Sequence, residues 1–103
     1  MRFLIIALMC FGYSTQALAW TVKGIGSDNC SVVLNDRTEH EFEYAQWILG
    51  YLSAKNHSLD ANVGAGVNWR GIMGAGVKFC RENPLRDWAD ASENVYAQLR
   101  ELQ

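Results

Sequence analysis

The chain has few of the side chains from which active sites are built. Its only two histidines are His40 and His57, in a sequence of 103 residues. It has three cysteines but no Cys-x-x-Cys pair, the spacing typical of a redox site. Its glycines do not follow Gly-x-Gly-x-x-Gly, and no Gly-Lys-Ser or Gly-Lys-Thr turn occurs. No serine–histidine–acid arrangement is recognisable. We therefore expect no catalytic site, no metal site and no cofactor.

Positive charge is also scarce. Nine lysines and arginines stand against eleven aspartates and glutamates, which gives a net charge of −2 at pH 7. A nucleic-acid-binding domain of this size would carry a basic patch or stripe, and the sequence contains none. We expect no nucleic-acid partner.

Uncharged apolar sequence is concentrated at the start of the chain. An apolar run from Phe3 to Phe11 precedes Ala17-Leu18-Ala19, a small-x-small cleavage site. This is the pattern of a secretory signal peptide, and it is too short to span a membrane. We predict that residues 1–19 are cleaved, with Cys10 among them, and that residues 20–103 form a single helical domain in the periplasm. The later apolar stretch is interrupted by polar side chains, so no transmembrane segment is expected after cleavage.

Two cysteines remain in the mature chain, Cys30 and Cys80. In an exported protein a disulfide between them is the natural interpretation, because the compartment is oxidising. The bond would close a loop of about 50 residues and contribute roughly 4 kcal/mol through the entropy of the unfolded chain. A domain this small has a marginal core, so the cross-link would supply much of its stability.

Hydrophobic periodicity predicts an all-α fold, a small bundle of three to four helices cross-linked by the disulfide. The first long helix is expected from Thr38, which forms a capping-box pattern with Glu41, to about Lys55 or Asn56. A second is expected over residues 68–81. Residues 20–29 are expected to form an extended, turn-rich arm; alternatively, Ser27-Asp28-Asn29 cap a short helix from Cys30 to Leu34.

The last helix has the clearest pattern. Asn83 followed by Pro84 is a strong helix start, because asparagine caps exposed amides and proline fits the first helical position. Apolar residues then recur every three or four positions, which gives one stripe for burial. The main members of this stripe are Leu85, Trp88, Val95, Leu99 and Leu102.

The first long helix has an unusually wide apolar face. Its inner face is Phe42, Ala45, Ile48, Leu49 and Leu52, beside an aromatic strip of Tyr44, Trp47 and Tyr51. Such width implies either burial on two sides or an exposed binding patch. Gly50 is expected to allow close approach of another helix. If aromatic side chains are exposed, Trp47, Tyr51 and Trp69 are the candidate partner-binding residues, because tryptophan and tyrosine dominate interface energetics.

Three acidic residues cluster where that helix begins, namely Glu39, Glu41 and Glu43. Carboxylates are favourable at a helix N-terminus, and their neutralisation at low pH would loosen it and expose apolar surface. They are therefore the candidate acid trigger. Glu39, His40 and Glu43 could alternatively hold a metal ion, although helix-dipole stabilisation explains the same residues more simply. His57 is expected in a solvated loop.

Two short stretches and the two cysteines carry a resemblance to known exported proteins. The stretches are Trp-Ile-Leu-Gly-Tyr-Leu-Ser at 47–53 and Phe-Cys-Arg-Glu-Asn-Pro-Leu at 79–85. The two-cysteine spacing and the cysteine before the final helix resemble HdeA-like periplasmic acid-stress chaperones. The two stretches are similar to immunity proteins that neutralise type VI secreted amidases.

These resemblances imply two functions. The leading hypothesis is a non-catalytic periplasmic protein that binds a protein partner, as an immunity protein does. The alternative is an acid-activated chaperone of the HdeA-like type. Neither the identity of the partner nor the oligomeric state follows from the sequence.

Overall fold

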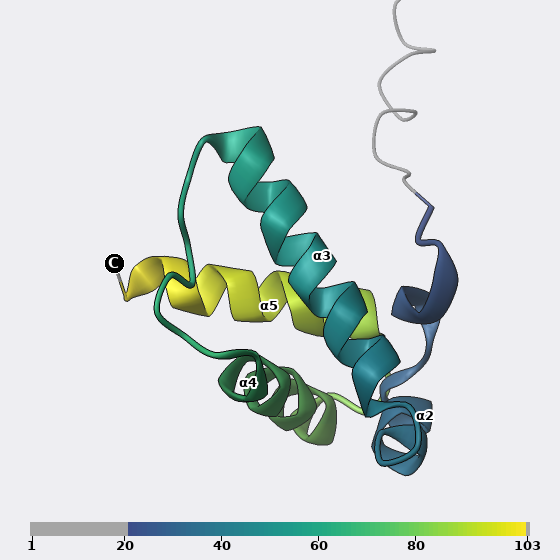
Figure 1. Cartoon of the computed structure of the whole chain (residues 1–103). Coiled ribbons are helices and arrows are strands. Elements are labelled where there is room, and N and C mark those ends of the chain that lie inside the picture. Colours follow the sequence, from purple (N-terminus) through teal and green to yellow (C-terminus); the bar gives the residue numbers. More distant parts are fainter. Residues whose placement is uncertain (1–20, 103) are drawn as a thin grey trace, which may run out of the picture.

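The computed structural model describes residues 21–102 (Figure 1). In chain order its elements are the 3₁₀ helix η2 (Gly24–Ser27) and the α-helices α2 (Cys30–Asp36), α3 (Glu41–Leu59), α4 (Trp69–Glu82) and α5 (Trp88–Glu101). The β-type pairing of these residues is limited to a bridge between Asn29 and Asp87, so the predicted all-α class is confirmed. The predicted signal peptide and its cleavage site lie outside the described residues.

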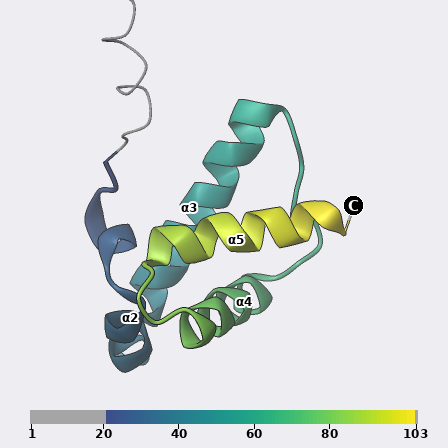
Figure 2. The ribbon, with the colours of Figure 1, turned by 180° about the vertical axis from the view of Figure 1, so that it is seen from behind.

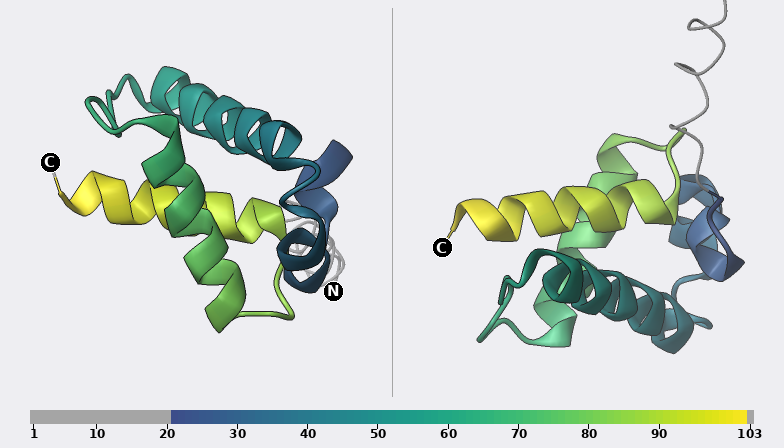
Figure 3. Two further views of the ribbon diagram at one scale, coloured as in Figure 1. Left: turned by 60° about the horizontal axis from the view of Figure 1, so that its bottom comes forward. Right: turned by 90° about the horizontal axis from the view of Figure 1, so that it is seen from above.

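Helices α3, α4 and α5 pack against one another, and α2 lies at one end of this group (Figure 1). From the loop after α3, α4 runs back toward α2, and α5 then returns in the opposite direction (Figures 1 and 2). The η2 segment packs on α3 and α5. Figure 1 shows α3 crossing α5 at a steep angle, and the left view of Figure 3 shows α4 crossing α5 as well. Within residues 21–102, every helix is too short or too polar to cross a bilayer.

Trp88 is the centre of the core. Its side chain is 0% exposed, and its indole Nε1 donates a hydrogen bond of 3.0 Å to the backbone oxygen of Tyr44. The two rings meet edge to face, with centroids 5.6 Å apart. Helix α4 approaches the indole closely at Gly76, where a Cβ would lie 2.6 Å from Trp88 Cη2. The predicted core position of Trp88 is confirmed, and Gly76 is the residue that makes room for it.

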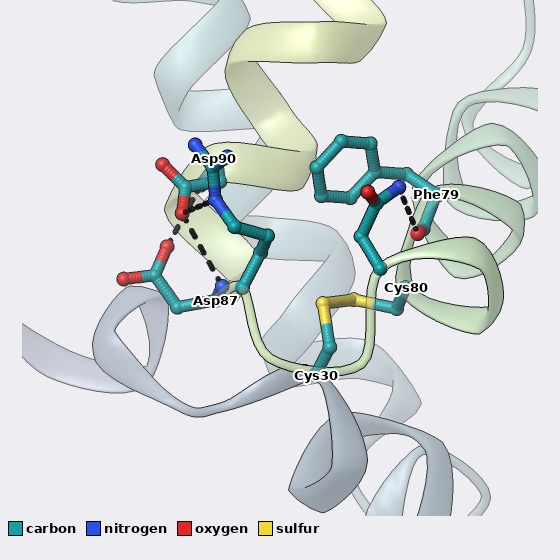
Figure 4. A network of polar contacts seen from close by, with 7 residues as sticks. Cys30, Phe79, Cys80, Asp87 and Asp90 are labelled. Carbon is teal, nitrogen blue, oxygen red and sulfur yellow. Dashed lines mark hydrogen bonds and ion pairs between the residues drawn. A yellow bond between two sulfur atoms is a disulfide. The ribbon is translucent and has the colours of Figure 1, made fainter.

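The predicted disulfide is present and joins the first residue of α2 to the last turn of α4 (Figure 4). The Cα atoms of Cys30 and Cys80 are 4.9 Å apart, and both side chains are fully buried. The bond therefore holds α2, a helix of 7 residues, against the core. A helix so short is unstable by itself in water, so its position depends on such tertiary links.

Two of the predicted helix starts are confirmed. Helix α2 is capped by Asn29, whose side chain accepts from the backbone N–H of Ser31 at 2.9 Å. Helix α4 is capped by Asn68, which accepts from Gly71 N at 2.9 Å. Both are the side-chain caps that asparagine provides at an N-terminus.

The predicted start of the last helix is wrong. Helix α5 begins at Trp88 and is capped by a reciprocal pair, in which Asp87 accepts from Asp90 N and Asp90 accepts from Asp87 N (Figure 4). Asn83 instead turns back and donates to the backbone oxygen of Phe79, at the end of α4. Leu85 lies in the connecting turn and is 89% exposed. At the other end, Leu102 follows the helix and is 81% exposed, so neither leucine belongs to the buried stripe.

The predicted start of the first long helix is also wrong. Helix α3 begins at Glu41, and its N-cap, His40, makes no side-chain capping bond. Thr38 lies in the turn that follows α2, where the backbone N–H groups of Glu39 and His40 both donate to Asp36 O. Phe42 is consequently 68% exposed rather than part of the inner face. The helix continues to Leu59, past the predicted end.

Gly50 does not mediate a helix contact, contrary to the prediction. It is exposed, and a Cβ built there would have no atom within 4 Å. Glycine inside a helix costs up to about 1 kcal/mol relative to alanine. We expect Gly50→Ala to raise the free energy of unfolding by about 0.5–1 kcal/mol in urea denaturation. Gly76→Ala is the matched contrast and should lower it, because its Cβ would strike the Trp88 ring.

Candidate functional site

The three predicted partner-binding aromatics are each partly buried, and the structure brings only two of them together. Trp47 and Tyr51 stack on α3, with ring centroids 5.9 Å apart. Trp69 opens α4, and its ring lies under the guanidinium of Arg70, 4.5 Å away. Among residues 21–102 no ring contact joins Trp69 to the stacked pair.

Trp47 has an evident structural role. Its indole Nε1 donates to the backbone oxygen of Lys23 at 3.1 Å, and its ring covers Gly26, where a Cβ would overlap it. Tyr51 faces α5, and burial raises the pKa of its hydroxyl, with Glu93 and Tyr96 adding to the effect. The stacked pair therefore helps to hold η2 and α5 against α3. Whether it also binds a partner remains a prediction.

The three carboxylates of the predicted acid trigger lie in different surroundings. Glu43 Oε2 lies 3.3 Å from His40 Nδ1. A hydrogen bond from its own backbone and this contact hold the pKa of Glu43 below its usual value, while Glu43 raises the pKa of His40. Glu39 lies in the turn before α3, and Glu41 faces a different neighbourhood, described below.

The metal alternative finds no support in the described residues, which contain no group of three or more histidine, cysteine or acidic side chains placed to hold an ion. The predicted loop position of His57 is wrong, because His57 lies in the last turn of α3.

A groove between α4 and the turn that joins α2 to α3 is the most distinctive surface feature. Three arginines line it: Arg37 from the turn, and Arg70 and Arg81 from opposite ends of α4. Glu41 is the carboxylate in the lining. We call this surface the arginine groove.

The floor of the arginine groove is apolar. Met73 and Val77 line it and are only 4% and 5% exposed. Between them on the helix, Gly74 leaves the groove open, since a Cβ there would meet no atom within 4 Å. The groove encloses about 260 Å³.

The sequence contained a partial signal for this site. Arg70, Gly74, Val77 and Arg81 are spaced by four, three and four positions, which places them on one side of a helix. Arg37 gave no such signal, because its contribution depends on how the α2–α3 turn packs on α4.

A larger hollow of about 560 Å³ lies between α3 and α5 and has a different character. Its charged lining alternates in sign: Lys55 and Arg100 accompany Glu93 and Glu101. Lys55 also lies over the Tyr96 ring, with Nζ 5.7 Å from the centroid. With its charges balanced, this hollow favours no ligand of one sign.

Comparison with known proteins gives no relative whose site could be compared with this one. No family model, curated protein or solved structure matches the chain. The resemblances drawn from the sequence therefore remain expectations. The arginine groove must be interpreted from its own chemistry.

Proposed function

We propose that this protein is an exported, non-catalytic protein that binds a protein partner, and that the arginine groove is where the partner docks. The observation that supports this best is the groove between α4 and the α2–α3 turn, which has an apolar floor and a charged rim. Such a combination is typical of the anchor sites in protein interfaces, where an apolar centre is surrounded by polar groups. The likeness to amidase immunity proteins points in the same direction.

The surroundings of the groove fit this function. Phe42, next in sequence to the groove residue Glu41, is 68% exposed. An aromatic side chain that the fold leaves exposed to water is available to a partner. Covering it would contribute about 2 kcal/mol to association.

Filling the groove tests the proposal. Gly74→Leu would place a side chain in the open space while improving helix propensity, so the fold should be retained. We expect this variant to lose the protein that the wild type captures from an extract of the cells that produce it. Gly50→Leu is the matched control, because Gly50 is also an exposed helical glycine with free space but lies outside the groove. Equal capture by both variants would contradict the proposal.

The second candidate, an acid-activated chaperone, has a specific observation in its favour. Carboxylates hold the junction at which α5 begins: Asp87 and Asp90 form its cap, and Asp28 accepts a 2.8 Å hydrogen bond from the Tyr44 hydroxyl. The hydrogen bond from Arg86 contributes most to lowering the pKa of Asp90. Protonation of these groups would weaken the contacts between the N-terminal segment, α3 and α5.

The sign of the pH effect follows from the lowered pKa of Asp90. The folded protein holds the ionised form more strongly than the unfolded chain, so the contribution is complete above the ordinary pKa of 3.8 and is lost as pH falls below it. We expect urea midpoints to fall between about pH 4 and pH 2, and Asp90→Asn to lessen that fall. Glu101→Gln, at the far end of α5, is the control. Under the chaperone hypothesis, the acid-loosened protein also suppresses light scattering by an aggregating client; unsuppressed scattering would remove this candidate.

A further inference from the structure

We propose that the arginine groove recognises an acidic segment of the partner protein, one in which carboxylate side chains flank apolar ones. This inference rests on the proposed function and specifies the chemistry of the partner.

Among residues 21–102, no carboxylate forms an ion pair with the arginines of the groove. The ion pairs among residues 21–102 are those of His40 with Glu43 and Arg86 with Asp90. Arg37, Arg70 and Arg81 therefore line one hollow without an ion pair to another described residue. In a chain with more acidic than basic residues, three cations around a single carboxylate form a local excess of positive charge.

The arrangement of these cations favours carboxylates. Guanidinium groups match the carboxylate with two parallel hydrogen bonds, which gives direction as well as attraction. Arg70 is already braced against the Trp69 ring, so less side-chain freedom is lost when it binds. Met73 and Val77 lie between the arginines that α4 contributes and, although nearly buried, form the apolar part of the lining that an apolar side chain of the same segment would meet.

The neighbouring charges argue against a larger polyanion. Asp36 precedes Arg37 and Glu82 follows Arg81 in the chain, and Glu41 lies in the groove itself. A nucleic acid or an anionic membrane is larger than the groove and would extend over the surface of a chain with more acidic than basic residues. A short peptide of mixed composition would meet only the groove.

A defined peptide tests the inference. The probe is a capped hexapeptide that alternates glutamate and leucine, titrated into the folded protein at low ionic strength and followed by amide chemical shifts. Its glutamine counterpart and inorganic phosphate are titrated in parallel. We expect the glutamate peptide to shift the amides of α4 and to bind at least about 10-fold more tightly than the glutamine peptide.

Charge-removing variants locate the binding. Arg70→Gln combined with Arg81→Gln should weaken the glutamate peptide roughly 10-fold, as expected for two partly exposed ion pairs. Arg100→Gln, on the far side of α5 and outside the groove, should leave it unchanged within about 2-fold. Added salt should weaken the wild-type complex.

The outcomes separate this inference from the proposed function. Equal binding of the two peptides, tighter binding of phosphate, or no shift on α4 would overturn the acidic-segment inference. If Gly74→Leu still abolished capture of the partner in those cases, the docking function would stand without it. If Gly74→Leu left capture intact, the docking function itself would fall.

Discussion

Replacing both Cys30 and Cys80 by alanine is expected to lower the free energy of unfolding by about 4 kcal/mol. The two residues are separated by 50 positions, and the chain-entropy model assigns roughly that value to a loop of this length. Total stabilities of small domains are about 5–15 kcal/mol, so the variant should be close to unfolded at physiological temperature. The first element to be lost is α2, whose seven residues depend on the bond for their position.

Urea denaturation followed by circular dichroism measures the effect. The reduced wild type is the internal control and should unfold at the same urea concentration as the double-alanine variant. A thiol titration of the unfolded, unreduced wild type should find both cysteines blocked. If the oxidised wild type and the variant differed by less than about 1 kcal/mol, the disulfide would not be the main support of the fold.

Trp88→Ala is expected to cost about 3–5 kcal/mol, the range found when a large aromatic side chain is removed from a core. The indole is fully buried and fills the space that Gly76 leaves on α4. Its loss would also leave the backbone oxygen of Tyr44 without the hydrogen bond that it accepts from the ring. Contacts to α3 and α4 would therefore weaken together.

Trp69→Ala is the matched control for this substitution. Trp69 is only partly buried and lies at the first position of α4, so its removal should cost no more than about half as much. Urea denaturation of the two variants compares them directly. Similar losses for both would show that the core is not organised around Trp88.

The starts of α2 and α4 were predictable from sequence, because each is capped by an asparagine that binds a backbone N–H only two or three residues further on. Asn68 sits directly before an apolar periodic segment, and its side chain caps that segment in the structure. Trp88 was placed in the core because its spacing fits the stripe of the last helix, and it is buried. The cysteine pairing followed from composition, since only Cys30 and Cys80 remain once residues 1–19 are predicted to be a signal peptide.

The start of α5 shows where local signals are insufficient. The sequence pattern favours Asn83 as the cap, whereas the structure uses Asp87, and tertiary hydrogen bonds explain the difference. Cys30 N donates to Arg86 O, and Trp88 N donates to Asp28 O, so the turn is paired with a segment far upstream. That pairing keeps residues 83–87 out of the helix, so α5 begins only at Trp88.

The candidate site was less predictable than the fold. Aromatic content drew attention to Trp47, but the structure uses its ring to cover Gly26 and its indole N–H to bind Lys23 O. The arginine groove requires Arg37 to meet α4 across the α2–α3 turn, a contact that no periodicity encodes. A single arginine on a helix face is common and does not predict a site. Only the meeting of three arginines in one groove indicates a binding surface.

Site-specific photo-cross-linking tests the central claim most directly. A benzoylphenylalanine at the position of Phe42 would stand next in sequence to the groove residue Glu41, and one at the position of Leu85 provides the control, since both side chains are largely exposed but Leu85 lies in the α4–α5 turn. After irradiation in the producing cells, the account predicts a cross-linked protein from position 42 that is absent at position 85 and is lost with Gly74→Leu. No adduct at position 42, or the same adduct at both positions, would contradict it.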